Sequence, residues 1–225
     1  MIVFSLVCIA ACFGLAMWAW QGLPVLDTYP VHWDAQGVAN GYGSKNEILF
    51  GLSILPLTSI FISLLFAFIP KIEPIRASIQ PNARPYNFVW GLCMVLFVAV
   101  QFYIAYLYSI LGTGATAPEI PVNFLVIGLS VFFIILGNIM GKLRRNFLFG
   151  VRTPWTLSSD LAWDKTHRLM GRMMVATGVA GLACAVFLPP PQIGIYAVIG
   201  LVLATTAYAF IYSYRVWKSD PDKRT

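Results

Sequence analysis

The stretch NFLFGVRTPWTLSSDLAWDKTH, residues 146–167, is polar and rich in aromatic rings, and an apolar run flanks it on each side. Each flanking run is close to the roughly 20 residues that a helix needs to cross a bilayer. A simple connector between membrane helices would not need the rings of Trp155, Trp163 and His167 together with interleaved charges. Residues 146–167, the second polar segment, are therefore one of two places where we expect function.

The composition predicts an α-helical membrane protein. The chain has 225 residues, of which 59% are hydrophobic and only 11% are charged, whereas a soluble domain carries about a quarter charged residues. The apolar stretches are continuous rather than alternating, which disfavours a β-barrel. Lys and Arg collect in the cytoplasmic loops of membrane proteins, so the net charge of +6 needs no direct binding of nucleic acid.

Six apolar spans predict an all-α, polytopic fold with six transmembrane helices. The first span lacks the basic start of a secretory signal, so we expect a retained helix, with cleavage near Ala16 as the alternative. Within the spans, only Gln101 and Asn138 are deep polar residues, which disfavours an ion-coupled transporter. The predicted spans are residues 2–22, 48–69, 88–111, 120–139, 169–188 and 193–214.

The distribution of basic residues predicts the orientation. Of the 15 Lys and Arg residues, only Lys45 lies in the loops that follow the first, third and fifth spans. Basic loops face the cytoplasm, so we expect both termini and residues 142–172 inside and residues 23–47 outside.

Small and sulfur-containing residues in the spans predict packing rather than chemistry. Glycines at helical spacing allow helices to approach closely, within one bundle more often than across a homodimer. The cysteines lie in apolar runs and indicate small hydrophobic residues, not a disulfide framework or a metal set. The glycines are Gly137, Gly141, Gly171, Gly178 and Gly181, and the cysteines are Cys8, Cys12, Cys93 and Cys184.

The first polar segment, LPVLDTYPVHWDAQGVANGYGSKNE at residues 23–47, predicts an ordered, turn-rich cap because it is rich in glycine. His32 and Asp34, with Asp27 and Glu47, make a metal site conceivable, but their spacing matches no strong ligand signature. We expect them to bond their own turn and predict no metal. The alternative to a plain lid is a docking surface for an external peptide, with Tyr29, Trp33 and Tyr42 as aromatic anchors.

The second polar segment predicts two helix starts. Thr153 before Pro154 fits an N-cap and first helical position, and Ser158 or Ser159 is expected to cap a second helix. On that helix Asp160, Asp164, His167 and Arg168 share one face, and a ladder of salt bridges is favoured over a catalytic Asp/His pair.

A buried Arg152 would need a carboxylate or carbonyl partner, and Asp160 and Asp164 are the nearest candidates. The chain carries no phosphate-binding loop, metalloprotease or nucleophile-elbow motif, so no catalytic residue and no cofactor is predicted.

The two polar segments resemble two known modules. The second resembles the signature of the SdpI family of bacterial membrane proteins, and the first resembles the DUF1648 module that commonly precedes it. We expect a DUF1648-like region at residues 1–70 with two spans, and an SdpI-like region at 71–225 with four spans and the signature at 142–168. The first match rests on Asn146, Gly150, Arg152, Thr153, Pro154, Trp155, Thr156, Leu157, Trp163, Thr166, His167 and Gly171, and the second on Pro30, His32, Trp33, Asp34, Gly37, Gly41, Tyr42 and Lys45.

The resemblance implies a non-enzymatic immunity protein of the bacterial plasma membrane. It would protect against a secreted, membrane-active peptide toxin of the SdpC type, and it would signal to a cytoplasmic regulator. The alternatives are a small-molecule or lipid transporter or flippase, and an enzyme using His32 with Asp34 or Asp164 with His167. The candidate binding residues are Tyr29, His32, Trp33, Asp34, Tyr42 and Lys45, and the candidate structural or signalling residues are Asn146, Gly150, Arg152, Thr153, Pro154, Trp155, Asp160, Trp163, Asp164 and His167.

Overall fold

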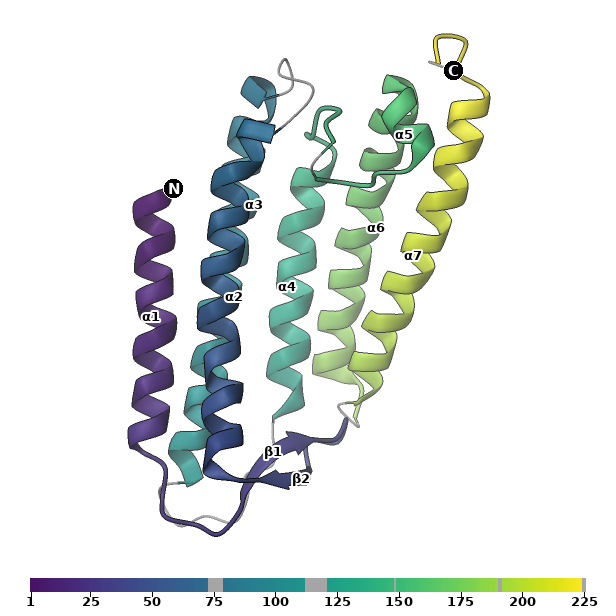
Figure 1. The fold of residues 1–225 in the computed structure, drawn as a ribbon. Helices are drawn as coiled ribbons and strands as arrows, with labels where there is room; N and C mark the ends of the chain where they lie inside the picture. The colour runs from purple at the N-terminus through teal and green to yellow at the C-terminus, as the bar shows by residue number, and fades with distance from the viewer. Residues whose placement is uncertain (73–78, 112–120, 148, 190–191, 224–225) are drawn as a thin grey trace. The chain divides into compact units, whose positions relative to one another are not determined.

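The chain is mainly helical (Figure 1). The computed structural model describes residues 1–72, 79–111, 121–147, 149–189 and 192–223; Ile120, where the fourth span was predicted to begin, lies outside them. In this part of the chain, six helices are long and apolar enough to cross a membrane, which confirms the predicted fold class. The elements are α1 (Ile2–Gln21), β1 (Tyr29–Trp33), β2 (Ala39–Gly43), α2 (Lys45–Ile72), α3 (Ile79–Leu111), α4 (Val122–Met140), the short α5 (Pro154–Ser158), α6 (Asp160–Phe187) and α7 (Gln192–Lys218).

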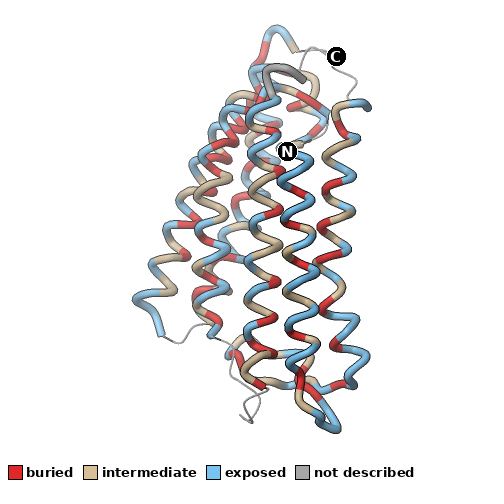
Figure 2. The backbone as a smooth tube through the Cα atoms, turned by 90° about the vertical axis from the view of Figure 1, so that its left-hand side faces the viewer, coloured by how far each residue is buried: buried red, intermediate tan, exposed pale blue. Residues whose placement is uncertain are grey.

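The long helices expose large apolar side chains. Phe61 on α2, Phe124 on α4 and Leu203 on α7 are 63%, 63% and 65% exposed. Buried and exposed positions recur along each helix (Figure 2). Apolar faces of this extent need a lipid environment, where helices satisfy their own backbone hydrogen bonds. The chain is therefore a multi-pass membrane protein.

Packing divides the chain into two compact units, Met1–Phe68 with Val89–Val122 and Ile69–Phe88 with Asn123–Thr225. The predicted domain boundary at residue 70 follows the motifs, whereas packing places most of α3 with α1 and α2. One contact of this kind is the stacking of Trp90 on Phe66, with ring centroids 5.8 Å apart.

In the first unit, the ends of three helices and a hairpin share one core. Strands β1 and β2 pair antiparallel, with Tyr29 opposite Gly43 and Trp33 opposite Ala39. The expected cap is thus a short β-hairpin, a regular element that the glycine-rich sequence did not predict. Tyr108 links α3 to the hairpin, because its hydroxyl donates a hydrogen bond to the Pro30 carbonyl at 3.2 Å. The core residues are Ala19, Leu23, Tyr29, Ile48, Leu52, Ala105, Tyr108 and Leu111.

In the second unit, glycines bring α4 and α6 into backbone contact. A Cβ atom on Gly137 would lie 2.6 Å from the Gly171 carbonyl oxygen, and one on Gly178 would lie 2.4 Å from the Ser130 carbonyl oxygen. Any larger residue would force the helices apart. The predicted packing of glycines within one bundle is therefore observed at Gly137, Gly171 and Gly178.

Candidate functional site

The second polar segment begins α5 with a reciprocal cap. Thr153 Oγ1 accepts a hydrogen bond from the Thr156 N–H at 3.1 Å, and Thr156 Oγ1 accepts one from the Thr153 N–H at 2.9 Å. Pro154 occupies the first turn, where its missing N–H costs least. Thr153 Oγ1 also lies 3.1 Å from the hydroxyl of Ser213 on α7. The predicted helix start at Thr153–Pro154 is confirmed, and it is anchored to a helix 60 residues away in sequence.

The start of α6 is capped by Ser159, one of the two predicted serines. Its hydroxyl accepts from the Ala162 N–H at 2.8 Å and donates to Asp220, which follows α7. This hydrogen bond is the main cause that lowers the pKa of Asp220, because it stabilises the ionised carboxylate. The two caps fasten α5 and α6 to α7.

Trp155 adds an aromatic contact to the same interface. Its ring centroid lies 4.8 Å from that of Phe210 and 5.2 Å from that of Tyr214, both on α7. Edge-to-face and tilted rings at this spacing are favourable. Trp155 therefore packs against a neighbouring helix instead of serving only at the membrane boundary.

Trp163 and His167 form the buried centre of the site. Both are 0% exposed, and their rings stack with centroids 3.9 Å apart. Trp163 Nε1 donates to the Leu143 carbonyl at 2.8 Å. His167 Nε2 accepts from the Val151 N–H at 2.9 Å, and Nδ1 lies 2.9 Å from the Trp163 carbonyl. An amide donor on one nitrogen and a carbonyl on the other require a neutral imidazole with its proton on Nδ1.

Gly150 makes this arrangement sterically feasible. Its φ is +110°, and a Cβ atom there would lie 2.4 Å from His167 Nε2. Beside it, Asn146 holds the loop by accepting from the Phe149 N–H at 2.8 Å and donating to the Arg144 carbonyl at 2.9 Å. The loop from Asn146 to Val151 is therefore shaped to deliver one backbone N–H to His167.

The charged residues pair differently from the sequence prediction. Asp160 forms an ion pair with Arg145, which also donates to the Leu157 carbonyl at 2.8 Å. Throughout the described ranges neither Asp164 nor Arg168 forms an ion pair, so the predicted ladder along α6 is wrong. Arg145 lies in the loop that follows α4, and it pairs with Asp160, which is the first residue of α6.

Arg152 is not buried, and its partner is a carbonyl rather than one of the two candidate aspartates. Arg152 is exposed and donates to the Phe147 carbonyl at 2.9 Å, without a carboxylate partner among the residues that the structure describes. A backbone carbonyl in the same loop satisfies it, and water can reach the rest of the guanidinium.

The first polar segment is built from local hydrogen bonds. Asp34 Oδ1 accepts from the N–H groups of Gln36 and Val38, each at 2.9 Å, and His32 Nδ1 lies 2.6 Å from Asn40 Oδ1. Both side chains thus bond their own hairpin, as predicted. Across the described chain, no group of three or more His, Cys, Asp and Glu residues could hold a metal ion.

The aromatic residues of the hairpin divide into two roles. Tyr29 is only 2% exposed and donates to the Pro24 carbonyl at 2.6 Å, and Trp33 packs edge-on against Tyr108. Tyr42, in contrast, is 57% exposed. Lys45 lies over the Trp20 ring at 4.8 Å. Of the three predicted anchors, Tyr29 is buried in the core, and Tyr42 presents the most surface.

Comparison with known proteins places both polar segments in matched regions. Residues 142–213 match the SdpI/YfhL protein family. Residues 7–57 match a domain of unknown function, DUF1648. Both resemblances noted in the sequence are thereby confirmed, and the SdpI/YfhL match extends from before Asn146 to Ser213, the partner of Thr153.

A curated relative comes from Bacillus subtilis (strain 168). Its name is "Immunity protein SdpI", and it is 32% identical over 101 residues, which are 44% of this chain and 48% of that protein. The match therefore spans about half the length of this relative. No solved structure matches the chain. Together with its six apolar helices, the SdpI/YfhL match identifies a multi-pass membrane protein of the bacterial cell.

Several residues that complete the site were missed from the sequence. Arg145 and the Leu143 carbonyl carry no motif signal, because their roles depend on how the loop folds back. Ser213 and Asp220 had weak signals: one is a small polar residue in an apolar span, and the other is an acid in a basic tail.

Proposed function

We propose that this chain is a non-enzymatic bacterial immunity protein that gives resistance to a secreted, membrane-active peptide toxin. The observation that carries the proposal is the 32% identity to an immunity protein, together with the family match over residues 142–213. The buried His167 has both ring nitrogens engaged, which supports a structural role rather than acid–base chemistry with Asp164.

The hairpin is the proposed toxin-facing surface. The distribution of Lys and Arg supports an extracytoplasmic position for residues 23–47. Tyr42, Val38 and Val25 are 57%, 46% and 97% exposed there, so they offer aromatic and apolar surface to a peptide. The acids of this segment outnumber its one lysine, which favours a cationic, SdpC-like partner. Trp33, His32 and Asp34 would support the binding surface by shaping the hairpin.

The second polar segment is proposed to lie on the cytoplasmic side of the membrane. Its contacts hold α5, α6 and α7 together, while the exposed Arg152 leaves a cationic side chain available to a soluble regulator. Signalling would require two conformations with different affinity for the toxin.

Survival of a sensitive bacterium tests the proposal. Cells expressing the full chain are challenged with an SdpC-type toxin and with an unrelated pore-forming peptide, and membrane levels are measured by immunoblot. We expect protection against the first peptide, reduced by Tyr42→Ala but not by Tyr196→Ala, an exposed tyrosine on α7 of similar accessibility at 61%. Well-expressed protein that protects against neither peptide contradicts the immunity role.

The variant Arg152→Ala distinguishes a structural role of Arg152 from a role in signalling. The exposed arginine makes one backbone hydrogen bond, so its loss should leave membrane levels unchanged. A changed transcriptional response to toxin at unchanged protein level would support a regulator contact, and an unchanged response would remove it.

Lipid or small-molecule transport is the second candidate, because Asn138 lines a groove in the second unit. Its amide donates to the Ile134 carbonyl of its own helix at 2.8 Å, which leaves only part of its polar capacity for a substrate. Transport of labelled lipid by proteoliposomes containing the chain, absent from empty liposomes, would favour this function over immunity alone.

A further inference from the structure

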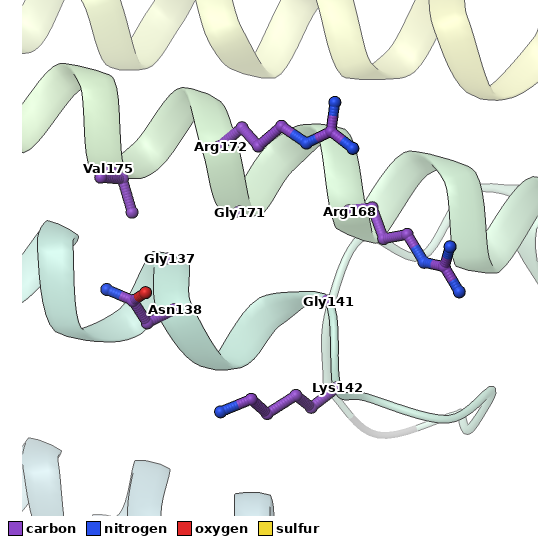
Figure 3. Close-up of a pocket in the computed structure, with 8 residues that line it drawn as sticks. All are labelled: Gly137, Asn138, Gly141, Lys142, Arg168, Gly171, Arg172 and Val175. Atoms are coloured by element: carbon purple, nitrogen blue, oxygen red, sulfur yellow. The ribbon is translucent and has the colours of Figure 1, made fainter.

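A groove of about 540 Å³ lies between α4 and α6 in the second unit. Figure 3 shows its floor, where Gly137 of α4 faces Gly171 of α6, and its basic side chains, of which two come from α6 and Lys142 comes from the loop after α4. The full lining is Gly137, Asn138, Gly141, Lys142, Arg168, Gly171, Arg172 and Val175.

The glycines explain both the closeness of the helices and the open space. At Gly137 and Gly171 the backbones touch, because a Cβ atom on either would lie 2.6 Å from the other's carbonyl oxygen. At Gly141 the nearest atom to an added Cβ would be Arg168 Cγ, at an ordinary contact distance of 3.4 Å. The groove therefore has a rigid floor at one end and free volume beside Gly141 at the other.

The charge of the groove is entirely positive. Lys142, Arg168 and Arg172 are exposed, and no carboxylate lines the groove. None of the three side chains makes a hydrogen bond or an ion pair with any residue in the described ranges. By contrast, Arg145 and Arg152 of the neighbouring loop are held by Asp160 and by a backbone carbonyl. These three cations are thus left without a protein counter-charge.

The position of the groove matches the boundary of a bilayer. Lys142 lies two residues beyond the end of α4 at Met140, and the uninterrupted apolar part of α6 begins after Arg172. Basic side chains at such a boundary extend toward lipid headgroups. Basic pockets between transmembrane helices are known to suit anionic headgroups.

We propose that this groove binds an anionic glycerophospholipid. The phosphate would lie among Lys142, Arg168 and Arg172, and an acyl chain would lie along Gly137, Gly171 and Val175. The apolar floor selects a lipid over free phosphate, and the three cations select an anionic over a zwitterionic headgroup. The groove shares no residue with the proposed toxin surface, and the proposed lipid binding does not depend on whether the chain confers immunity.

Lipid binding to the purified full chain tests the proposal. Native mass spectrometry in detergent would be titrated with phosphatidylglycerol, with phosphatidylcholine and with inorganic phosphate. We expect bound phosphatidylglycerol in clear excess over phosphatidylcholine, and no competition from millimolar phosphate. The variants Lys142→Gln, Arg168→Gln and Arg172→Gln should each weaken phosphatidylglycerol binding about fivefold. Lys165→Gln, an exposed α6 residue outside the groove, should leave it unchanged.

Gly141→Leu provides a test that keeps all three charges. Because a Cβ atom at Gly141 would make only ordinary contacts and Gly141 lines the groove, the helices should stay packed while the leucine fills the groove and displaces the lipid. Equal binding of the two lipids, wild-type affinity in the triple glutamine variant, or displacement of lipid by phosphate would each overturn the proposal.

Discussion

Both polar segments are ordered loops between apolar helices, but different kinds of contact order them. In the hairpin, the side chains of Asp34 and His32 bond groups within eight residues of themselves. In the second polar segment, Thr153 and Ser159 bond Ser213 and Asp220, which are 60 and 61 residues away. The first segment is therefore a surface formed by local contacts. The second is a cluster of long-range contacts that determines how α5, α6 and α7 pack.

This difference leads to a general expectation. Substitutions at the buried positions of the second polar segment should lower the stability of the second unit, because they remove packing or leave a buried partner unsatisfied. Substitutions at exposed hairpin positions should alter binding at nearly constant stability.

The largest effect is expected for Trp163→Ala. Removing a fully buried ring leaves a cavity and an unpaired Leu143 carbonyl, and it should cost about 4 kcal/mol. The measurement is denaturant unfolding of the purified protein in detergent. Trp18→Ala, at a position 47% exposed on α1, is the control. Equal losses for the two variants would contradict a buried centre at Trp163.

Gly150→Ala should come next, with a loss of about 3 kcal/mol. The added Cβ combines a strained φ of +110° with a clash against His167 Nε2 at 2.4 Å. Gly128→Ala is the matched control, since nothing lies within 4 Å of its added Cβ. Both are compared by thermal unfolding in the same detergent, and a Gly150→Ala protein as stable as the control would show that the loop is not held as described.

Thr153→Ala should cost about 1 kcal/mol, the usual value of an N-cap. It removes the hydroxyl that serves both the Thr156 N–H and Ser213. Thr153→Ser keeps the hydroxyl and should recover most of the stability in the same unfolding assay. If serine proves no better than alanine, the methyl group rather than the cap accounts for the loss.

The smallest effect concerns pH. The pKa of Asp220 is lowered, first by the hydrogen bond from Ser159 and then by the N–H of Asp222. A lowered pKa means that the stabilisation is complete above the unfolded-state pKa, near pH 4, and is lost as the pH falls through the folded-state value. The hydrogen-exchange protection factors of residues 219–223, which are corrected for the slower intrinsic exchange in acid, should therefore fall in acid.

Asp220→Asn is the control for this acid effect. It cannot ionise, so its protection factors at neutral pH should already resemble those of the acidified wild type and should change little below pH 4. Wild-type protection factors that are independent of pH in this range would contradict a role for the Asp220 carboxylate.

Much of the architecture could be predicted from the sequence. Apolar runs of bilayer length identified the six helices, and Thr153–Pro154 and the adjacent serines Ser158 and Ser159 indicated two helix starts, because these signals depend only on neighbouring residues. The partner of Asp160 could not be predicted. Within α6 its spacing favoured a ladder, but Arg145 lies in a loop whose path depends on the fold.

The hairpin and the division of the chain into two units could not be predicted from the sequence either. Glycine-rich residues between Pro30 and Gly43 indicated turns, but the sequence did not indicate that they pair as strands or that Tyr108 of α3 bonds to them. The motifs suggested a boundary at residue 70, while packing joins Val89–Val122 to the N-terminal helices, because side-chain contacts do not follow chain order.

By itself, then, the sequence determined the membrane-spanning character of the chain, its six helices and the resemblance of its two polar segments to known families, since these follow from local composition and spacing. Only the tertiary structure decided that Trp163 and His167 are a buried stacked pair, that Arg152 is exposed, and that Lys142, Arg168 and Arg172 share one groove. The physical reason is that burial and charge pairing depend on which surfaces meet, and the helices α4, α6 and α7 meet through glycines, caps and rings far apart in the chain.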